Sequence, residues 1–249
     1  MISRAAKVPA MSPAPPDVMI LSGGRGTRLQ EHTQTVPKPL VEIGGRPIVW
    51  HVIRIYAAQG FRRFALLTGH QSELVEEFVR AERWPDGVEV TCVFTGEDTP
   101  TGGRIHRARS AVGGGTFAVT YADGVADLDL AAELSHHRAH GRLATMAVVR
   151  PELQFGVTEI GGDGRVSGFK EKPRSDHWIN GGFFFLEPGA FAYLGDSSVF
   201  EREPLESLAT DGQLHVWRHT GFWECMDTYK DAITLNDLWA GDAPWKVWA

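Results

Sequence analysis

The sequence predicts an α/β domain in which a mostly parallel sheet is flanked by helices and followed by a smaller β-rich portion. Over residues 18–149, short apolar runs that are typical of buried strands alternate with segments whose apolar residues recur at helical spacing. From residue 155 onward the pattern changes to glycine pairs and aromatic runs, which are typical of hairpins and strands. The alternation in the first part favours a Rossmann-like sheet covered by helices on both faces.

The individual elements follow from these patterns in chain order. Strands are expected at residues 18–21, 64–68, 88–94, 117–121 and 143–149, and helices at residues 47–58, 72–81, 129–140 and 228–239. Ser72 and Asp129 are the expected N-caps of two of these helices. Gly161-Gly162-Asp163-Gly164 predicts a hairpin turn, and the run at 183–186 predicts one further strand.

Composition sets the domain organisation and excludes several classes of protein. The 249 residues are 43% hydrophobic and 22% charged, as in one large globular domain, which we place at residues 18–249. Residues 1–17 contain four prolines and no periodicity, and we expect a disordered tail there. The net charge of −6 argues against a partner nucleic acid, and no apolar run of about 20 residues predicts a membrane helix. Cys92 and Cys225 form no CxxC pair, which favours the cytoplasm.

A glycine-rich loop follows the first expected strand directly, at residues 22–28. Glycines at 23, 24 and 26 let backbone N–H groups approach phosphate oxygens, and the Arg28 guanidinium can bind two such oxygens at once. Leu29 stands where a dinucleotide fingerprint needs a small residue, and no Gly-Lys-Ser/Thr completes a P-loop. A tight turn with a surface arginine is the structural alternative.

Lys38 lies in Pro37-Lys38-Pro39, ten residues after Arg28. The two prolines restrict the backbone and disfavour helix, so the lysine is presented from a stiff segment. Together with the glycine loop, this lysine resembles the signature of the sugar nucleotidyltransferases, which make NDP-sugars from a nucleoside triphosphate and a sugar 1-phosphate.

The resemblance extends over residues 18–249. Further motifs recur in order: Thr101-Gly102-Gly103-Arg104, residues 123–129, Glu171-Lys172-Pro173, residues 180–184 and Met226-Asp227-Thr228. The end of the chain, residues 243–248, is similar to the end of one branch, the glucose-1-phosphate cytidylyltransferases. The family implies the nucleotidyltransferase fold and an enzyme that joins an NTP to a sugar 1-phosphate.

The resemblance also implies the roles of single residues. The metal ion Mg²⁺ is held by Asp123 and Asp227. The reacting phosphates are contacted by Arg28, Lys38 and Lys172. The sugar 1-phosphate is bound by Glu171, Lys172, Asn180 and Gly181. The nucleotide is bound by Leu21, Ser22, Gly23, Gly24, Arg25, Gly26, Thr27, Thr99, Thr101, Gly102, Arg104 and Ala122.

Each of these motifs also has a structural alternative. The Asp123 side chain could accept hydrogen bonds from the backbone of its own turn, and Asp227 could cap the helix that begins at 228. Glu171-Lys172-Pro173 could be a surface turn. His136, His137 and His140 share a helix at metal-ligand spacing, but no third ligand group is evident, and we interpret them as neutral surface histidines.

The resulting hypothesis is transfer of a nucleotidyl group from CTP to α-D-glucose 1-phosphate. The segment at residues 81–100 is shorter than the corresponding segment in that branch, and Ala122 replaces the glycine that usually precedes the metal-binding aspartate. UTP, dTTP and GTP therefore stay open as nucleotide donors. A non-catalytic nucleotide-sugar-binding protein is the alternative from another class. Four of the eight tryptophans follow residue 220, which favours packing or a subunit contact and therefore a homo-oligomer.

Overall fold

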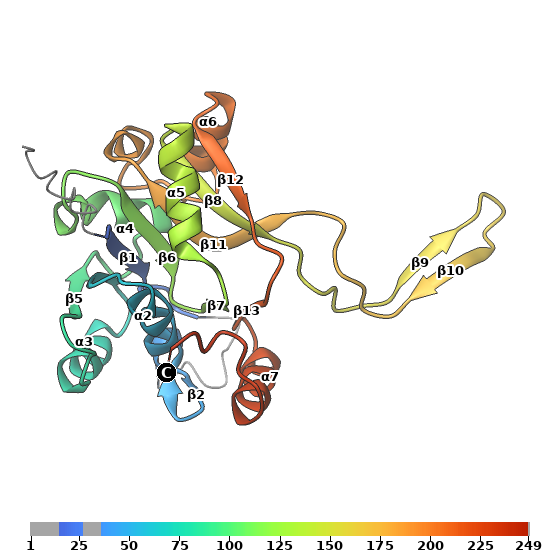
Figure 1. The fold of residues 1–249 in the computed structure, drawn as a ribbon, viewed down its shortest axis with the longest axis horizontal. Helices are drawn as coiled ribbons and strands as arrows, with labels where there is room; N and C mark the ends of the chain where they lie inside the picture. Colours follow the sequence, from blue (N-terminus) through green and yellow to red (C-terminus); the bar gives the residue numbers. More distant parts are fainter. Residues whose placement is uncertain (1–14, 27–35, 249) are drawn as a thin grey trace, which may run out of the picture.

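A seven-stranded sheet forms the centre of the molecule in the computed structural model, which describes residues 15–26 and 36–248 (Figure 1). Its strands, in spatial order, are β12 (Leu214–Arg218), β8 (Ala144–Val149), β11 (Ile179–Leu186), β6 (Phe117–Tyr121), β1 (Asp17–Leu21), β4 (Arg63–Thr68) and β5 (Glu89–Phe94). Only β11 runs against the others, since it pairs antiparallel with both β6 and β8. The mostly parallel α/β sheet predicted from the sequence is therefore confirmed.

Helices cover both faces of this sheet. One face carries α2 (Ile48–Ala58), α3 (Ser72–Ala81), α5 (Leu130–His140) and α7 (Tyr229–Ala240). The other carries α4 (Thr101–Arg107), α6 (Glu203–Thr210) and the 3₁₀ segment η4 (Pro188–Tyr193). Each strand contributes side chains to both faces because successive side chains point in opposite directions. Val18 and Ile20 of β1 pack in the hydrophobic core under α2, α3, α5 and α7, and Met19 packs in the core under α4, α6 and η4.

Three small antiparallel pairs and two short 3₁₀ segments are the remaining elements of residues 15–26 and 36–248. They are β2 (Glu42–Ile43) with β3 (Arg46–Pro47), β7 (Gly124–Ala126) with β13 (Trp223–Cys225), β9 (Val157–Ile160) with β10 (Val166–Lys170), η2 (Lys38–Leu40) and η3 (Arg109–Ala111). The hairpin predicted at 161–164 is confirmed as the turn between β9 and β10.

The β9–β10 hairpin projects far from the rest of the molecule (Figure 1). Phe155, Ile160 and Phe169 on this arm are 80%, 67% and 63% exposed, which is unusual for large apolar side chains. The β-rich portion expected after residue 155 is consequently divided. β11 and β12 join the central sheet, β13 pairs with β7, and the β9–β10 arm stands apart.

Two expected boundaries are corrected by local contacts. Asp17, assigned to the tail, is the first residue of β1, because its buried carboxylate pairs with Arg63 at 2.6 and 2.8 Å and accepts from the Gly113 N–H. Residues 1–14 of the expected tail lie outside the described residues. Ser72 is the first helical residue and not the N-cap, which is Gln71 at a φ of 54°. Asp129 is the expected cap of α5 and accepts from the Ala132 N–H at 2.8 Å.

The C-terminal tryptophans pack within the chain. Trp245 is fully buried, its ring contacts Trp239 and His51, and its indole N–H donates to His51 Nδ1 at 3.3 Å. Docking of Trp245 against a neighbouring subunit, one of the two expectations, is therefore wrong. The homo-oligomer itself has to be argued from another surface.

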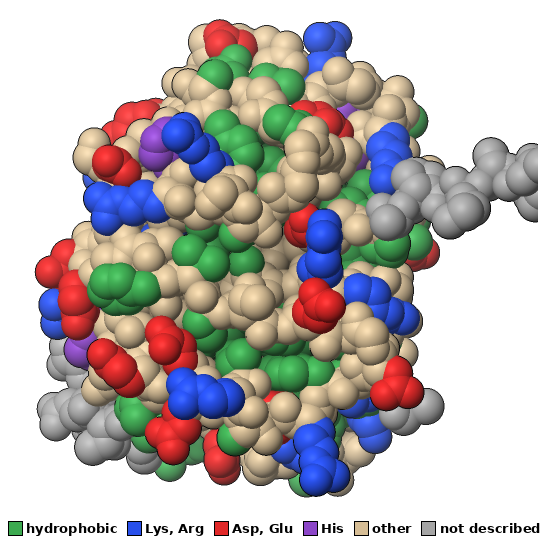
Figure 2. Space-filling model, turned by 90° about the vertical axis from the view of Figure 1, so that its left-hand side faces the viewer, with side chains coloured by type: hydrophobic (Ala, Val, Ile, Leu, Met, Phe, Trp, Pro, Cys, Tyr) green, Lys and Arg blue, Asp and Glu red, His purple; other side chains and the backbone are tan. Residues whose placement is uncertain are grey.

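Two surface features bear on the classes excluded by composition. No helix among residues 15–26 and 36–248 combines the length and apolar character needed to cross a bilayer. On the side of the molecule that carries α3 and β5, basic and acidic side chains are interspersed (Figure 2). That side therefore presents a mixed and not a continuous basic surface.

Candidate active site

A cavity of about 390 Å³ opens where β1 and β6 end, at the carboxyl edge of the parallel strands. Ligands bind at this edge in open α/β sheets. Its lining is drawn from five separate segments: Leu21, Ser22, Gly23, Gly24, Gly26, Lys38, Pro39, Thr99, Pro100, Thr101, Arg104, Tyr121, Ala122, Asp123 and Asp227. Most of the expected nucleotide-binding residues and both expected metal ligands thus surround one cavity.

Asp123 and Asp227 meet because β7 pairs with β13. Asp123 directly precedes β7, and Asp227 lies two residues after Cys225, the end of β13. In the antiparallel register Cys225 faces Gly124, and the Met226 N–H donates to the Asp123 carbonyl at 2.9 Å. This small ladder brings together two carboxylates that are remote in sequence.

The Lys38 ammonium lies between these two carboxylates. Lys38 Nζ is 2.5 Å from Asp123 Oδ2 and 2.7 Å from Asp227 Oδ1. Burial lowers the pKa of Lys38, but the charges and hydrogen bonds of the two aspartates outweigh it and leave that pKa raised. The lysine is therefore a fixed positive charge at neutral pH. Pro37 sets the extended backbone from which η2 presents it.

The structural alternative for Asp227 is wrong, because Thr228 is the N-cap of α7. The Thr228 hydroxyl accepts from the Asp231 N–H, and the Asp231 carboxylate accepts from the Thr228 N–H at 2.7 Å, which makes a capping box. The same carboxylate also accepts from the Asp227 N–H at 3.0 Å. Asp231 thus fixes the Asp227 backbone and leaves its side chain directed to the cavity.

The donor set around Lys38 fits a magnesium ion. Mg²⁺ prefers hard oxygen ligands and is commonly held by one or two carboxylates together with phosphate oxygens and water. Asp123 and Asp227 offer two carboxylates that already reach one cation, the Lys38 ammonium, beside an open cavity. This chemistry is compatible with the metal that the sequence predicted.

The described part of the glycine loop lies along the cavity. Gly26 adopts a φ of +60°, a left-handed conformation that favours glycine. Arg25 does not line the cavity; its guanidinium pairs with Asp98 at 2.9 Å and so ties the loop to the segment after β5. Thr27 and the expected catalytic residue Arg28 lie outside the described residues.

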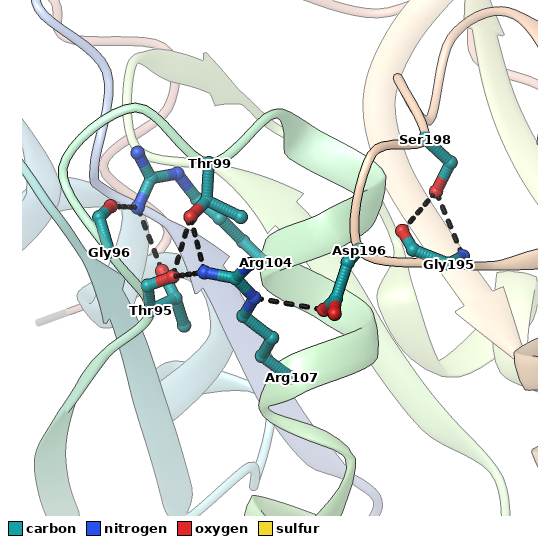
Figure 3. A network of polar contacts seen from close by, with 8 residues as sticks. All are labelled: Thr95, Gly96, Thr99, Arg104, Arg107, Gly195, Asp196 and Ser198. Carbon is teal, nitrogen blue, oxygen red and sulfur yellow. Dashed lines mark hydrogen bonds and ion pairs between the residues drawn. The ribbon is translucent and has the colours of Figure 1, made fainter.

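Arg104 lines the cavity and is held by a network of hydrogen bonds, part of which is drawn in Figure 3. It is only 4% exposed, and its guanidinium donates to acceptors from three segments: Gly23 O, Thr68 O, Thr95 Oγ1, Gly96 O and Glu97 O. Arg107, one turn along α4, donates to Thr95 O and Thr99 Oγ1 at 2.8 Å and pairs with Asp196. The two arginines hold residues 95–99 against the glycine loop. We therefore interpret Arg104 as a positioning residue for the expected nucleotide site.

Thr101 and Tyr121 are joined at the cavity rim by Glu201. Its carboxylate accepts from the Tyr121 hydroxyl at 2.5 Å and from Thr101 Oγ1 at 2.6 Å. Burial, followed by the charge of Glu201, raises the pKa of Tyr121, which therefore stays protonated. Gly102 packs against Ser198 and does not line the cavity.

Sequence reasoning missed Tyr121, Pro39, Pro100 and Glu201. The first three adjoin predicted site residues, and that adjacency was the available signal. Glu201 follows no recognised motif, so the sequence carried no signal for it.

The residues expected to bind the sugar are divided between two places. The Asn180 amide donates to the Tyr121 hydroxyl at 3.3 Å, and the Gly181 carbonyl accepts from the Trp223 indole at 2.7 Å, so both lie near the cavity. Glu171 and Lys172 directly follow β10 on the projecting arm and are exposed (Figure 1). Lys172 has a φ of +44°, a strained conformation of the kind that clusters at functional sites.

The chain is similar to known proteins in sequence and in fold. A profile of the family described as nucleotidyl transferase matches residues 17–232. A probable glucose-1-phosphate cytidylyltransferase of Bacillus subtilis is 41% identical over 92% of this chain and 99% of its own length. A glucose-1-phosphate cytidylyltransferase of Salmonella typhimurium is 40% identical over 92% of this chain and 98% of its own. The crystal structure of HddC from Yersinia pseudotuberculosis shares the fold, with a TM-score of 0.70 at 23% identity over 90% and 99% of the two chains.

Proposed function

We propose, because this chain belongs to the nucleotidyl transferase family, that it transfers the cytidylyl group of CTP to glucose 1-phosphate and releases pyrophosphate. The chain is a sugar-1-phosphate nucleotidyltransferase. The observation that carries the proposal is the position of Lys38 between Asp123 and Asp227, in a cavity that also exposes the glycine loop. The names of the two relatives support the choice of CTP and glucose 1-phosphate.

The reaction is a direct displacement at the α-phosphorus. A phosphate oxygen of the sugar phosphate forms the new P–O bond, and the bond to the bridging α–β oxygen breaks, its electron pair leaving with pyrophosphate. No covalent enzyme intermediate is needed, so the protein acts by orienting both substrates and stabilising charge. Gly23, Gly24 and Lys38 line the cavity, where backbone N–H groups of the two glycines would bind the triphosphate and Lys38 would supply a point charge to the reacting phosphates.

Asp123 and Asp227 are the residues that would hold Mg²⁺. When bound, the ion neutralises phosphate charge and so makes the α-phosphorus more open to attack. The Lys38 ammonium pairs with the same two carboxylates that would hold the ion. We therefore infer that Lys38 leaves the aspartates for the phosphate oxygens once substrate and metal are in place.

Selection of cytosine requires an acceptor for its exocyclic amino group. The Gly23 carbonyl already accepts from Arg104 at 2.9 Å and from the His70 N–H at 3.2 Å, so it is poorly suited to this task. We infer that the acceptor is a backbone carbonyl close to Thr101. UTP presents an oxygen at the corresponding position, and two facing acceptors leave a buried polar group unpaired.

The proposal is tested by pyrophosphate release from CTP, UTP, dTTP, GTP and ATP, each combined with a panel of sugar 1-phosphates. We expect CTP with glucose 1-phosphate to have the highest kcat/KM, at least about tenfold above UTP. Equal or better turnover with another nucleotide would contradict the cytidylyl assignment. Absence of turnover with every pair would favour a nucleotide-sugar-binding protein.

We further propose a homo-oligomer in which the β9–β10 arm contacts a second copy. The exposed Phe155, Ile160 and Phe169 side chains give the arm apolar area to bury, and Glu171 and Lys172 lie at its base end. Light scattering of the intact chain should give a multiple of its 27.4 kDa mass. Replacing Phe155, Ile160 and Phe169 with serine should lower that mass.

The cytoplasm is the compartment that we propose for this enzyme. Cys92 and Cys225 are both free thiols, which agrees with a reducing environment. Cell fractionation with antibody detection of the untagged protein tests the assignment.

A further inference from the structure

Three histidines converge between α5 and β12, the edge strand of the sheet. Figure 1 shows these two elements side by side. His136 and His140 are one turn apart on α5, and His215 is the second residue of β12. One nitrogen from each of the three lies within 4.8 Å of the other two. The third ligand group, which was not evident from the sequence, is thus His215, which lies 75 positions after His140 in the chain.

We propose that His136, His140 and His215 form a binding site for one Zn²⁺-type divalent transition-metal ion, separate from the catalytic cavity. Imidazole nitrogen is a preferred donor for Zn²⁺ and its neighbours Co²⁺, Ni²⁺ and Cu²⁺, whereas Mg²⁺ prefers oxygen. Three imidazoles leave one position of a tetrahedral ion to water.

An unsatisfied polar atom marks the site. His136 Nε2 is buried and has no hydrogen-bond partner among the described residues. Buried polar atoms of this kind are uncommon, because their desolvation is not compensated. The His136 ring is enclosed by His140, His215 and Trp217, at centroid distances of 5.2, 6.5 and 5.5 Å. A metal ion would give the nitrogen a partner.

His140 is held in the orientation that a ligand needs. The Arg142 N–H donates to His140 Nδ1 at 3.0 Å, so the ring proton is on Nε2, which donates to Thr145 Oγ1 at 2.7 Å. Ligating histidines commonly donate their second N–H to such a neighbour, which fixes the ring. We infer that His140 binds through Nδ1, with the exposed Arg142 N–H released to water.

Thr145, which accepts the His140 N–H, is itself held by further hydrogen bonds. Its hydroxyl donates to His137 Nδ1 at 2.8 Å, and His137 Nε2 then donates to Glu187 Oε1 at 3.1 Å. His137 is therefore a buried structural residue and not the surface histidine that the sequence suggested.

The exposed His215 completes the site by a side-chain rotation. Its ring now stacks on His140 at a centroid distance of 4.3 Å, an arrangement in which the two in-plane lone pairs do not converge on one ion. His215 is exposed, so a new rotamer is accessible to it. A bound metal ion would then link the edge strand β12 to α5 through its histidine ligands.

This effect is expected on stability and not on turnover. Leu214, at the start of β12, pairs with Ala144, at the start of β8, so the histidines lie near the amino ends of these strands. The catalytic cavity lies at the opposite, carboxyl edge of the sheet.

The test uses tag-free full-length protein that has been stripped of metal with EDTA and dialysed. Binding of Zn²⁺ is followed by calorimetry, Co²⁺ is followed by its visible absorption, and melting is followed with and without Zn²⁺. We expect one high-affinity ion per chain, a Co²⁺ spectrum of tetrahedral type, and a Tm increase of several degrees at about 100 times the Kd.

Variants assign the binding to these residues. His215→Ala changes an exposed side chain and should weaken Zn²⁺ binding at least about tenfold and remove the Tm increase. His136→Gln should do the same. His177→Ala, an exposed histidine before β11, and Asp123→Asn, at the catalytic cavity, should both retain the full response. An unchanged response in His215→Ala, or no Zn²⁺ response in the wild type, would overturn the proposal.

Discussion

The Arg104 guanidinium packs directly against Gly23 and donates to its carbonyl oxygen at 2.9 Å. A Cβ at Gly23 would overlap this guanidinium. Glycine is therefore required at this position because the Arg104 side chain packs against the backbone, and not because the backbone adopts an unusual φ. One buried arginine therefore sets the distance between the glycine loop and residues 95–99, and the cavity is lined by Gly23 from the first segment and Thr99 from the second.

The first prediction follows from this contact. Arg104→Lys should raise the KM for the nucleotide about tenfold or more and change kcat less, because a lysine has no planar fork to reach the acceptors of three segments at once. Steady-state kinetics with varied CTP measures the effect. Arg109→Lys, an exposed arginine on η3, is the matched control and should behave as wild type. A tenfold loss that falls on kcat alone would contradict a positioning role.

The second prediction concerns the two carboxylates at Lys38. Asp123→Asn and Asp227→Asn should each leave the fold intact and lower kcat by about a hundredfold or more, because each removes charge from the metal site. Raising the Mg²⁺ concentration should recover part of the loss. Asp129→Asn is the matched control, since asparagine caps a helix as well as aspartate does. Near wild-type turnover of both variants would contradict the assignment.

Local patterns predicted the elements that carry this site. The strand at 117–121 is recognised as an apolar run that ends at Ala122-Asp123-Gly124, and the strand at 143–149 as an apolar run after a helix. The position of β11 between β6 and β8 was not predictable, because its aromatic run fits any buried strand and its partners are remote in sequence. Helix α4 was missed because Gly102 and Gly103 lower helix propensity.

The candidate site was predicted to the extent that its residues lie in motifs. Asp123, Asp227 and Lys38 were all named from sequence, but their mutual contact depends on the β7–β13 pair, which is only three residues long in each strand. Arg104 was assigned to the nucleotide. That its guanidinium instead binds backbone carbonyls depends on how three loops meet.

The third prediction concerns acid stability and His51. Burial lowers the pKa of this fully buried histidine to about 4, although the hydrogen bond between its Nε2 and Ile43 O opposes the shift, and its Nδ1 accepts from the Trp245 indole. The unfolded chain takes up this proton near pH 6.5 and the folded chain only near pH 4. The free energy of unfolding should therefore fall as the pH drops from 6.5 to 4, by about 3 kcal/mol for this group, and level off below.

Urea denaturation between pH 4 and pH 8 measures this contribution. His51→Gln keeps a donor for the Ile43 carbonyl but does not titrate, so its stability should change less with pH than that of the wild type, whatever its absolute value. His177→Asn, at an exposed position, is the control and should keep the wild-type slope. Equal slopes for His51→Gln and wild type would show that another group dominates acid unfolding.

The last prediction concerns the separation of Glu171 and Lys172 from the cavity. Both residues lie on the projecting arm, whereas Asn180 contacts Tyr121 in the cavity wall (Figure 1). If the arm of one chain completes the site of another, a chain with a damaged cavity and a chain with a damaged arm should complement each other. We expect this outcome, because the exposed apolar side chains of the arm favour contact with a second copy.

Co-expression of Asp123→Asn with Lys172→Ala provides the measurement. In a dimer that assembles at random, half of the assemblies are mixed, and each mixed dimer has one site with an intact cavity and an intact arm. Activity should therefore rise to about a quarter of the wild-type value, far above that of either variant alone. The double variant Asp123→Asn/Lys172→Ala, co-expressed with Lys172→Ala, is the control and should stay inactive, because neither chain supplies an intact arm. Activity of the first pair no greater than the mean of its two variants would mean that each arm serves its own chain.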